Sequence, residues 1–207
     1  NNLITITGKA ADGTTKINGT PKQENSVSKS PTTITSLRLD EFDSITLTSL
    51  GSPYQTSILL LVPEGKTLTI EPGVTLKFFT SITPSDAGLE VKGTLRAIGT
   101  QIKPIIFTAQ TVPYFWKGIQ FTSNLTDTTS EMNWVTIEYA KRGTDPLSAQ
   151  SADSHTFTLR NSIVRNYECN NCRGIKLIRS NATIENTQFL GGYPNQPTFG
   201  VHIEFGN

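Results

Sequence analysis

Polar residues recur at one position of a repeated short segment that begins with glycine. Four such segments carry a polar residue two positions after the glycine: Glu90, Gln120, Lys176 and His202. Carboxylate, ammonium and imidazole groups transfer protons, while all four side chains can also hold a polar ligand. No carboxylate pair can be placed at the separation that glycoside hydrolysis requires, and nucleophile-elbow, P-loop, dinucleotide and HExxH motifs are missing. Any solvated strand face carries such residues, so plain solvation remains open. Among functional roles ligand contact is favoured over catalysis, and a polysaccharide lyase or glycoside hydrolase is the alternative.

Aromatic residues precede two of these segments at similar distances. VPYFW at 112–116 precedes Gly118, and YPNQPTF at 193–199 precedes Gly200, so both should lie at the same corner of neighbouring turns. Aromatic rings stack on the flat CH faces of sugars. Trp116 could instead be a corner packing residue. The candidate ligand-binding residues are Tyr114, Trp116, Gln120, Lys176, Tyr193 and His202.

Cysteine and acidic residues offer few ligands for a cofactor. Cys169 and Cys172 are the two cysteines, and a zinc site would need a second pair or nearby histidines. We expect a small disulfide between them that pins the loop at 167–173 and adds little stability because it closes so few residues. The acidic residues Asp40, Glu41 and Asp43 could bind calcium through oxygen ligands, although a solvated turn is favoured. No other metal or cofactor is indicated.

The elements that must position these residues are short strands in a repeat. Runs of four or five residues with alternating apolar side chains end at Gly or Pro turn signals, which is typical of strands. The four glycines are 30, 56 and 26 residues apart, so a degenerate unit near Gly143 should fill the middle gap. Such short units cannot bury their own apolar faces and must stack. The sequence predicts an all-β, right-handed parallel β-helix with three short strands per coil.

An asparagine series supports this repeat. Asn133, Asn161 and Asn186 each precede an alternating run, at spacings of 28 and 25 residues. Asparagine tolerates the left-handed backbone region, and its amide can bond to a stacked asparagine one coil away. We expect these three amides to lie at one corner on successive coils and to hydrogen-bond to each other.

Several segments of the chain match a known repeat family. VPEGKTLTIEPGVTLKF at 62–78, GLEVKGTLRAIGTQIKPIIFTA at 88–109 and FWKGIQF at 115–121 resemble the right-handed parallel β-helix repeat proteins of bacterial surfaces and secretions, with pectin-lyase-like architecture. MNWVTIEYA at 132–140 continues the pattern, and residues 1–55 do not match. The family includes lyases, adhesins and proteins of no known activity, so the resemblance implies the fold and leaves function open.

The domain organisation follows from a change in sequence pattern near residue 58, where the repeated alternating runs begin. Residues 1–57 should form an N-terminal β cap or extension, with a separate small β domain as the alternative, and residues 58–207 the parallel β-helix. The chain begins at Asn1 without a signal peptide and ends just after the start of a coil, so we expect the natural polypeptide to continue.

Charge and hydropathy exclude some classes of partner. The net charge is +1 and charged residues make up 17% of the chain, so no field favours nucleic acid, and no apolar run could span a bilayer. Together these features predict a non-enzymatic adhesion or binding module, and the family resemblance implies that it is extracellular or on the bacterial outer surface. Its partner would be a glycan or cell-surface ligand, and it could be part of a larger polypeptide or a homo-oligomeric fibre.

Overall fold

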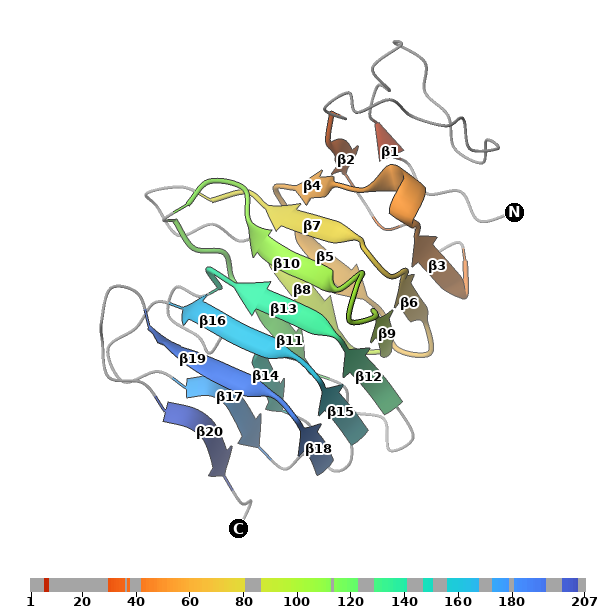
Figure 1. Cartoon of the computed structure of the whole chain (residues 1–207). Coiled ribbons are helices and arrows are strands. Elements are labelled where there is room, and N and C mark those ends of the chain that lie inside the picture. Colours follow the sequence, from red (N-terminus) through yellow and green to blue (C-terminus); the bar gives the residue numbers. More distant parts are fainter. Residues whose placement is uncertain are drawn as a thin grey trace.

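The computed structural model of the chain describes residues 6–7, 30–35, 37, 42–80, 87–112, 114–122, 129–140, 147–150, 156–167, 173–178, 181–192 and 199–204. These residues form an all-β fold of stacked parallel strands, with one 3-10 turn at Ser49–Gly51 (Figure 1). In this part of the chain no helix is long and apolar enough to cross a membrane. The predicted all-β parallel β-helix with three short strands per coil is confirmed.

Three sheets run along the stack. Sheet A contains, in spatial order, β1 (Ile6–Thr7), β2 (Thr32–Ile34), β4 (Tyr54–Thr56), β7 (Thr75–Phe78), β10 (Ile105–Ala109), β13 (Val135–Glu138), β16 (Ile163–Tyr167) and β19 (Gln188–Gly192). Sheet B contains β3 (Ser44–Leu47), β6 (Thr67–Ile70), β9 (Thr94–Ile98), β12 (Thr129–Asn133), β15 (Thr156–Arg160) and β18 (Asn181–Glu185). Sheet C contains β5 (Leu59–Val62), β8 (Gly88–Val91), β11 (Ile119–Phe121), β14 (Leu147–Gln150), β17 (Arg173–Ile178) and β20 (Phe199–Glu204).

The path of the chain defines the corners between sheets. From β5 onward each coil runs from sheet C to sheet B to sheet A before the next coil begins in sheet C. We call the connection from sheet B to sheet A the B/A corner, and the connection from sheet A to sheet C the A/C corner. β14 lies between β11 and β17, so it supplies the degenerate unit that the glycine spacing predicted.

The parallel ladders begin before the sequence match does. β3 pairs in parallel with β6, and β4 pairs in parallel with β7. β2 extends sheet A beyond β4 in the same direction, and β1 closes that edge with an antiparallel pairing. Sheets A and B therefore run across the predicted domain boundary between residues 57 and 58.

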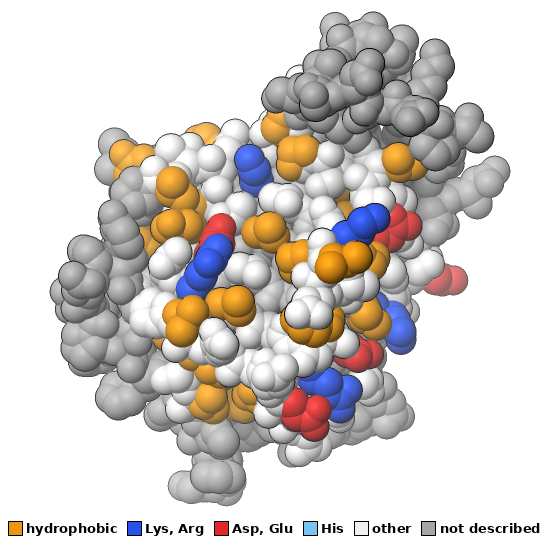
Figure 2. Space-filling model, in the orientation of Figure 1, with side chains coloured by type: hydrophobic (Ala, Val, Ile, Leu, Met, Phe, Trp, Pro, Cys, Tyr) orange, Lys and Arg blue, Asp and Glu red, His pale blue; other side chains and the backbone are white. Residues whose placement is uncertain are grey.

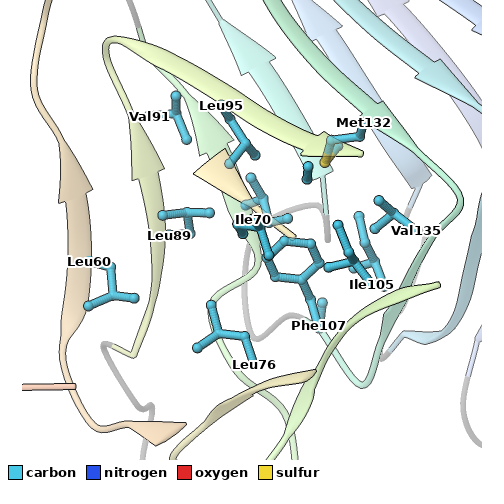
Figure 3. Packing of buried hydrophobic residues seen from close by; sticks show 14 of the residues in the cluster. Leu60, Ile70, Leu76, Leu89, Val91, Leu95, Ile105, Phe107, Met132 and Val135 are labelled. Carbon is cyan, nitrogen blue, oxygen red and sulfur yellow. The ribbon is translucent and has the colours of Figure 1, made fainter. Parts of the chain in front are cut away.

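The core fills the space between the three sheets. Alternation sends every second side chain of a strand inward, and stacking places like positions of successive coils together. Leu89 pairs with Ile119 in sheet C, and Leu76 pairs with Phe107 in sheet A; all four side chains are buried. Figure 3 shows how side chains from all three sheets meet in this interior. Each fully buried aliphatic or aromatic side chain contributes about 1.5–3 kcal/mol to folding.

Glycine at the start of sheet C strands has a steric cause. A Cβ atom on Gly174 would collide with the ring of Phe189 and lie 2.9 Å from the carbonyl oxygen of Gly200. Gly118 has a φ of 91°, in the left-handed region that other residues rarely adopt. The A/C corner therefore leaves no room for a side chain at Gly174, whereas β5 carries Leu59 at the position that pairs with Gly88 and a Cβ on Gly200 would meet only ordinary contacts.

The asparagine ladder is present at the B/A corner. The Asn161 Nδ2 donates to Asn133 Oδ1 at 3.0 Å, and the Asn186 Nδ2 donates to Asn161 Oδ1 at 2.7 Å. Asn161 and Asn186 have φ values of 49° and 45°, whereas on the preceding coil Trp134 has the left-handed backbone, with a φ of 52°. The predicted amide ladder is confirmed, with Asn133 offset by one residue.

Candidate functional site

The polar residues singled out in the sequence form one row on the outer face of sheet C. Glu90 pairs with Gln120, Gln120 with Ser148, Ser148 with Lys176, and Lys176 with His202. Successive members of this row are about 4.8 Å apart. Four strands of sheet C therefore align the four predicted residues. A fifth strand, β14, adds Ser148 to the row, which the glycine pattern missed because β14 lacks the glycine.

Neighbouring polar groups orient the carboxylate of this row. Glu90 Oε1 accepts a hydrogen bond from Thr122 Oγ1 at 2.9 Å and lies 3.8 Å from Lys92 Nζ. The side chains of Gln120 and Lys176 are half-buried, whereas those of Ser148 and His202 lie outside the described residues. Among the row's described side chains, Glu90 is the one carboxylate, so the row offers polar contacts and no carboxylate pair of the kind glycoside hydrolysis uses.

Tyr114 lies at the A/C corner, between β10 and β11. Its backbone N–H donates to the Thr111 carbonyl oxygen at 3.1 Å, which closes a tight turn. Tyr193 falls outside the described residues and lies between β19 and β20 in the sequence. β11 and β20 are separated by β14 and β17 in sheet C. The expectation that the two aromatic segments occupy neighbouring turns is therefore wrong, because their strands are about 14 Å apart along the stack.

Trp116 lies in the core and not on the surface. Its side chain is 0% exposed and stacks on Phe78, with ring centroids 4.0 Å apart and planes at 5°. The indole Nε1 donates to the Glu138 carbonyl oxygen at 2.9 Å, so burial leaves no polar group unsatisfied. Trp116 therefore fixes the corner by packing, and a surface ligand cannot reach it.

Three further side chains make the A/C corner aromatic. Phe79 follows β7, and the Phe115 ring lies 6.5 Å from that of Tyr139, which follows β13. Because Thr80 Oγ1 donates to the Thr111 carbonyl oxygen at 3.2 Å, the segments after β7 and β10 lie side by side. We define the aromatic corner as Phe79, Val112, Tyr114, Phe115 and Tyr139.

The aromatic corner exposes apolar surface. Phe79 is 46% exposed, Val112 54% and Tyr114 40%. On the face shown in Figure 2, hydrophobic side chains are scattered among uncharged polar ones, with only a few acidic and basic groups. The aromatic residues directly after β7 and β13, Phe79 and Tyr139, were a usable sequence signal. This signal lies outside the glycine pattern, which marks the beginnings of the sheet C strands and not the ends of the sheet A strands.

The predicted disulfide and calcium ligands are largely beyond the part of the chain that the structure describes. Cys169 and Cys172 lie outside it, as do Asp40 and Glu41. The Asp43 carboxylate is described, and Lys66 Nζ donates to its Oδ1 at 2.8 Å. This hydrogen bond and the charge of Lys66 lower the pKa of Asp43 below its ordinary value. Within the described ranges no group of three or more His, Cys, Asp or Glu residues could hold a metal ion.

Comparisons with protein-family models, curated proteins and solved structures found no match for this chain.

Proposed function

We propose that this protein is a non-enzymatic adhesion or binding module that recognises glycans at the A/C corner. The supporting observation is the aromatic corner, where the exposed rings of Phe79 and Tyr114 come from successive coils and precede, in the chain, the sheet C strands that carry Glu90 and Gln120 of the polar row. Flat apolar faces beside amide, hydroxyl and ammonium groups suit a sugar chain, which presents CH faces and hydroxyls. The site would therefore bind an extended ligand through many weak contacts.

Each residue of the site has a distinct role in this proposal. Tyr114 and Phe79 provide stacking surfaces, and Gln120 and Lys176 orient the ligand through polar contacts. Tyr193 and His202 belong to the same proposed site, and both side chains lie outside the described part of the chain. Weak single-site binding gains strength from repetition, so a larger polypeptide or a homo-oligomeric fibre would supply avidity.

Cellular location is part of the same proposal. The chain's motifs resemble those of pectin-lyase-like β-helix proteins of bacterial surfaces, and a role outside the cell or on a bacterial outer surface follows from that resemblance. A cell-surface glycan would be within reach of a module held there. An exported setting also suits a disulfide between Cys169 and Cys172.

A glycan array with the purified chain tests the proposal. The Tyr114→Ala, Tyr193→Ala double variant should lose about tenfold or more in affinity for the glycan that the parent binds, because each lost stacking contact is worth about 1 kcal/mol. Leu50→Ala is the matched control, since it removes an exposed apolar side chain elsewhere on the molecule and should leave binding unchanged. Circular dichroism must show that all variants are folded.

Two results would contradict the proposal. One is a folded double variant that binds as tightly as the parent, which would move the site elsewhere. The other is depolymerisation of an acidic polysaccharide by the parent chain that Lys176→Ala abolishes, which would establish the enzyme alternative.

A further inference from the structure

Left-handed residues bracket the sheet A strand in three successive coils. In each coil two such residues stand five positions apart, at the start and end of β13, β16 or β19. The pairs are Trp134 and Tyr139, Asn161 and Asn166, and Asn186 and Gly191, with φ values between 37° and 54°. The corner geometry therefore requires left-handed backbone at two fixed positions of each of these coils.

Residue type follows this requirement in two of the three coils. Asparagine and glycine enter the left-handed region readily, whereas a bulky aromatic residue there is an outlier that costs stability. The coil of β13 has aromatic residues at both positions. Strained residues of this kind persist where they serve a function or where packing compensates them.

Packing accounts for one of the two aromatic residues. Tyr139 packs against the buried core and lies near Phe115. Trp134 is half-buried but belongs neither to the buried core nor to the side chains packed on it. Core packing therefore does not compensate the strain at Trp134.

The amide ladder is built differently in the coil that contains Trp134 than in the two coils that follow. In the following coils the left-handed residue itself carries the ladder amide, at Asn161 and Asn186. In the coil of β13 the preceding residue, Asn133, supplies the acceptor instead, so the position of Trp134 is free for an aromatic ring. The side-chain amide nitrogen of Asn133 donates no hydrogen bond to the described residues. Asn133 directly precedes Trp134 in the sequence.

Arg160, whose backbone bonds to Trp134, is paired with two carboxylates. The Trp134 backbone N–H donates to the Arg160 carbonyl oxygen at 3.2 Å. The Arg160 guanidinium lies 2.7 Å from Glu185 and 3.9 Å from Glu131. Arg160 is therefore engaged by carboxylates, while Lys103 on the turn before β10 adds a second positive charge to set against Glu131 and Glu185. These two positive and two negative charges balance. A neutral ligand at this corner would meet an aromatic ring, amide donors and the exposed apolar side chain of Ile102, at 88% exposure on the same turn.

We propose that Trp134 and Asn133 form a second sugar-binding site, at the B/A corner, that takes a neutral oligosaccharide. The indole stacks on the CH face of one sugar ring, and the Asn133 amide donates to a sugar hydroxyl. This inference rests on the proposed glycan-binding function and adds a separate site with its own ligand class. The strain at Trp134 is the cost of presenting the ring.

Trp134→Asn tests the inference because it restores the residue type of the next two coils. It should raise the melting temperature by about 2–4 °C through loss of strain, and weaken binding of cellohexaose or xylohexaose about tenfold in calorimetry. In the parent, either neutral sugar should shift tryptophan emission, since the remaining tryptophan, Trp116, is buried. Leu50→Asn is the control and should change neither quantity.

The outcomes separate this inference from the proposed function. A lower melting temperature for Trp134→Asn, or unchanged affinity for both neutral sugars, overturns the inference. If only the Tyr114→Ala, Tyr193→Ala variant loses binding, the aromatic corner stands and the second site does not. If only Trp134→Asn loses binding, the second site stands and the aromatic corner is misplaced. Failure of the parent to bind any glycan on the array contradicts both.

Discussion

The B/A and A/C corners differ in the length of their connections and in the interactions that stabilise them. At the B/A corner the connections at 134, 161–162 and 186–187 are very short, and side-chain amides link one coil to the next. At the A/C corner the connections at 79–87, 110–118 and 139–146 are longer, and aromatic side chains gather there. One corner is held by a repeated hydrogen-bond pattern, and the other is held by packing.

The connections at the B/A corner are therefore constrained in length, whereas those at the A/C corner can vary. An amide ladder works only if every coil places its donor and acceptor at the same height, so an insertion would break two hydrogen bonds at once. A corner fixed by a buried ring such as Trp116 leaves the rest of its connection free to vary in length and composition. Recognition residues accumulate on such variable segments, which a rigid scaffold positions.

In the first coil, the backbone at the B/A corner is hydrogen-bonded by a tyrosine and not by an asparagine. The Tyr54 hydroxyl donates to the Thr48 carbonyl oxygen at 3.0 Å and accepts from the Thr48 N–H at 3.1 Å. A buried tyrosine thus caps the backbone where later coils use asparagine. The corner therefore needs a polar partner for its backbone or its amides, and the residue type can differ.

The largest effect should come from Trp116→Ala, which removes the packing that fixes the A/C corner. The cavity should lower the free energy of unfolding by about 3–5 kcal/mol, measured by urea denaturation. Tyr114→Ala, two residues away on the surface, is the control and should change it by no more than about 0.5 kcal/mol. Equal effects of the two substitutions would mean that this corner is not held by packing.

Asn161→Ala should have an intermediate effect, at the centre of the amide ladder. It removes the donor to Asn133 and the acceptor for Asn186, so the free energy of unfolding should fall by about 1–2 kcal/mol. Asn166→Ala changes a left-handed asparagine at the other end of β16 and should cost less. An unaltered melting temperature for Asn161→Ala would show that the ladder does not stabilise the corner.

Tyr54→Phe should have the smallest effect, about 1 kcal/mol at neutral pH, because Thr48 loses both hydrogen-bond partners. Burial raises the pKa of Tyr54 above 10.0. A raised pKa in the folded state means that this hydroxyl's stabilisation is intact below pH 10 and is lost as the pH rises further. Thermal denaturation between neutral pH and pH 11 should show a shallower alkaline loss for the variant, and identical slopes would contradict this assignment.

Sequence alone was sufficient for the fold and for the asparagine ladder. Short alternating runs ended by Gly or Pro can only be strands, and the period shared by the glycines and asparagines requires stacking. The row Glu90, Gln120, Lys176 and His202 followed directly, because strand alternation and a constant period place such residues in register. These features depend on local geometry repeated at a fixed interval, which a linear pattern records.

Only the tertiary structure decided which aromatic residues are surface and which are core. Trp116 and Tyr114 are two positions apart in one segment, yet one stacks on Phe78 in the interior and the other is exposed. Irregular corners lack the period that makes strand direction readable, so burial there depends on contacts with coils distant in sequence. The left-handed backbone of Trp134 was hidden for the same reason, because it is imposed by the register of the neighbouring coil and not by tryptophan's own preference.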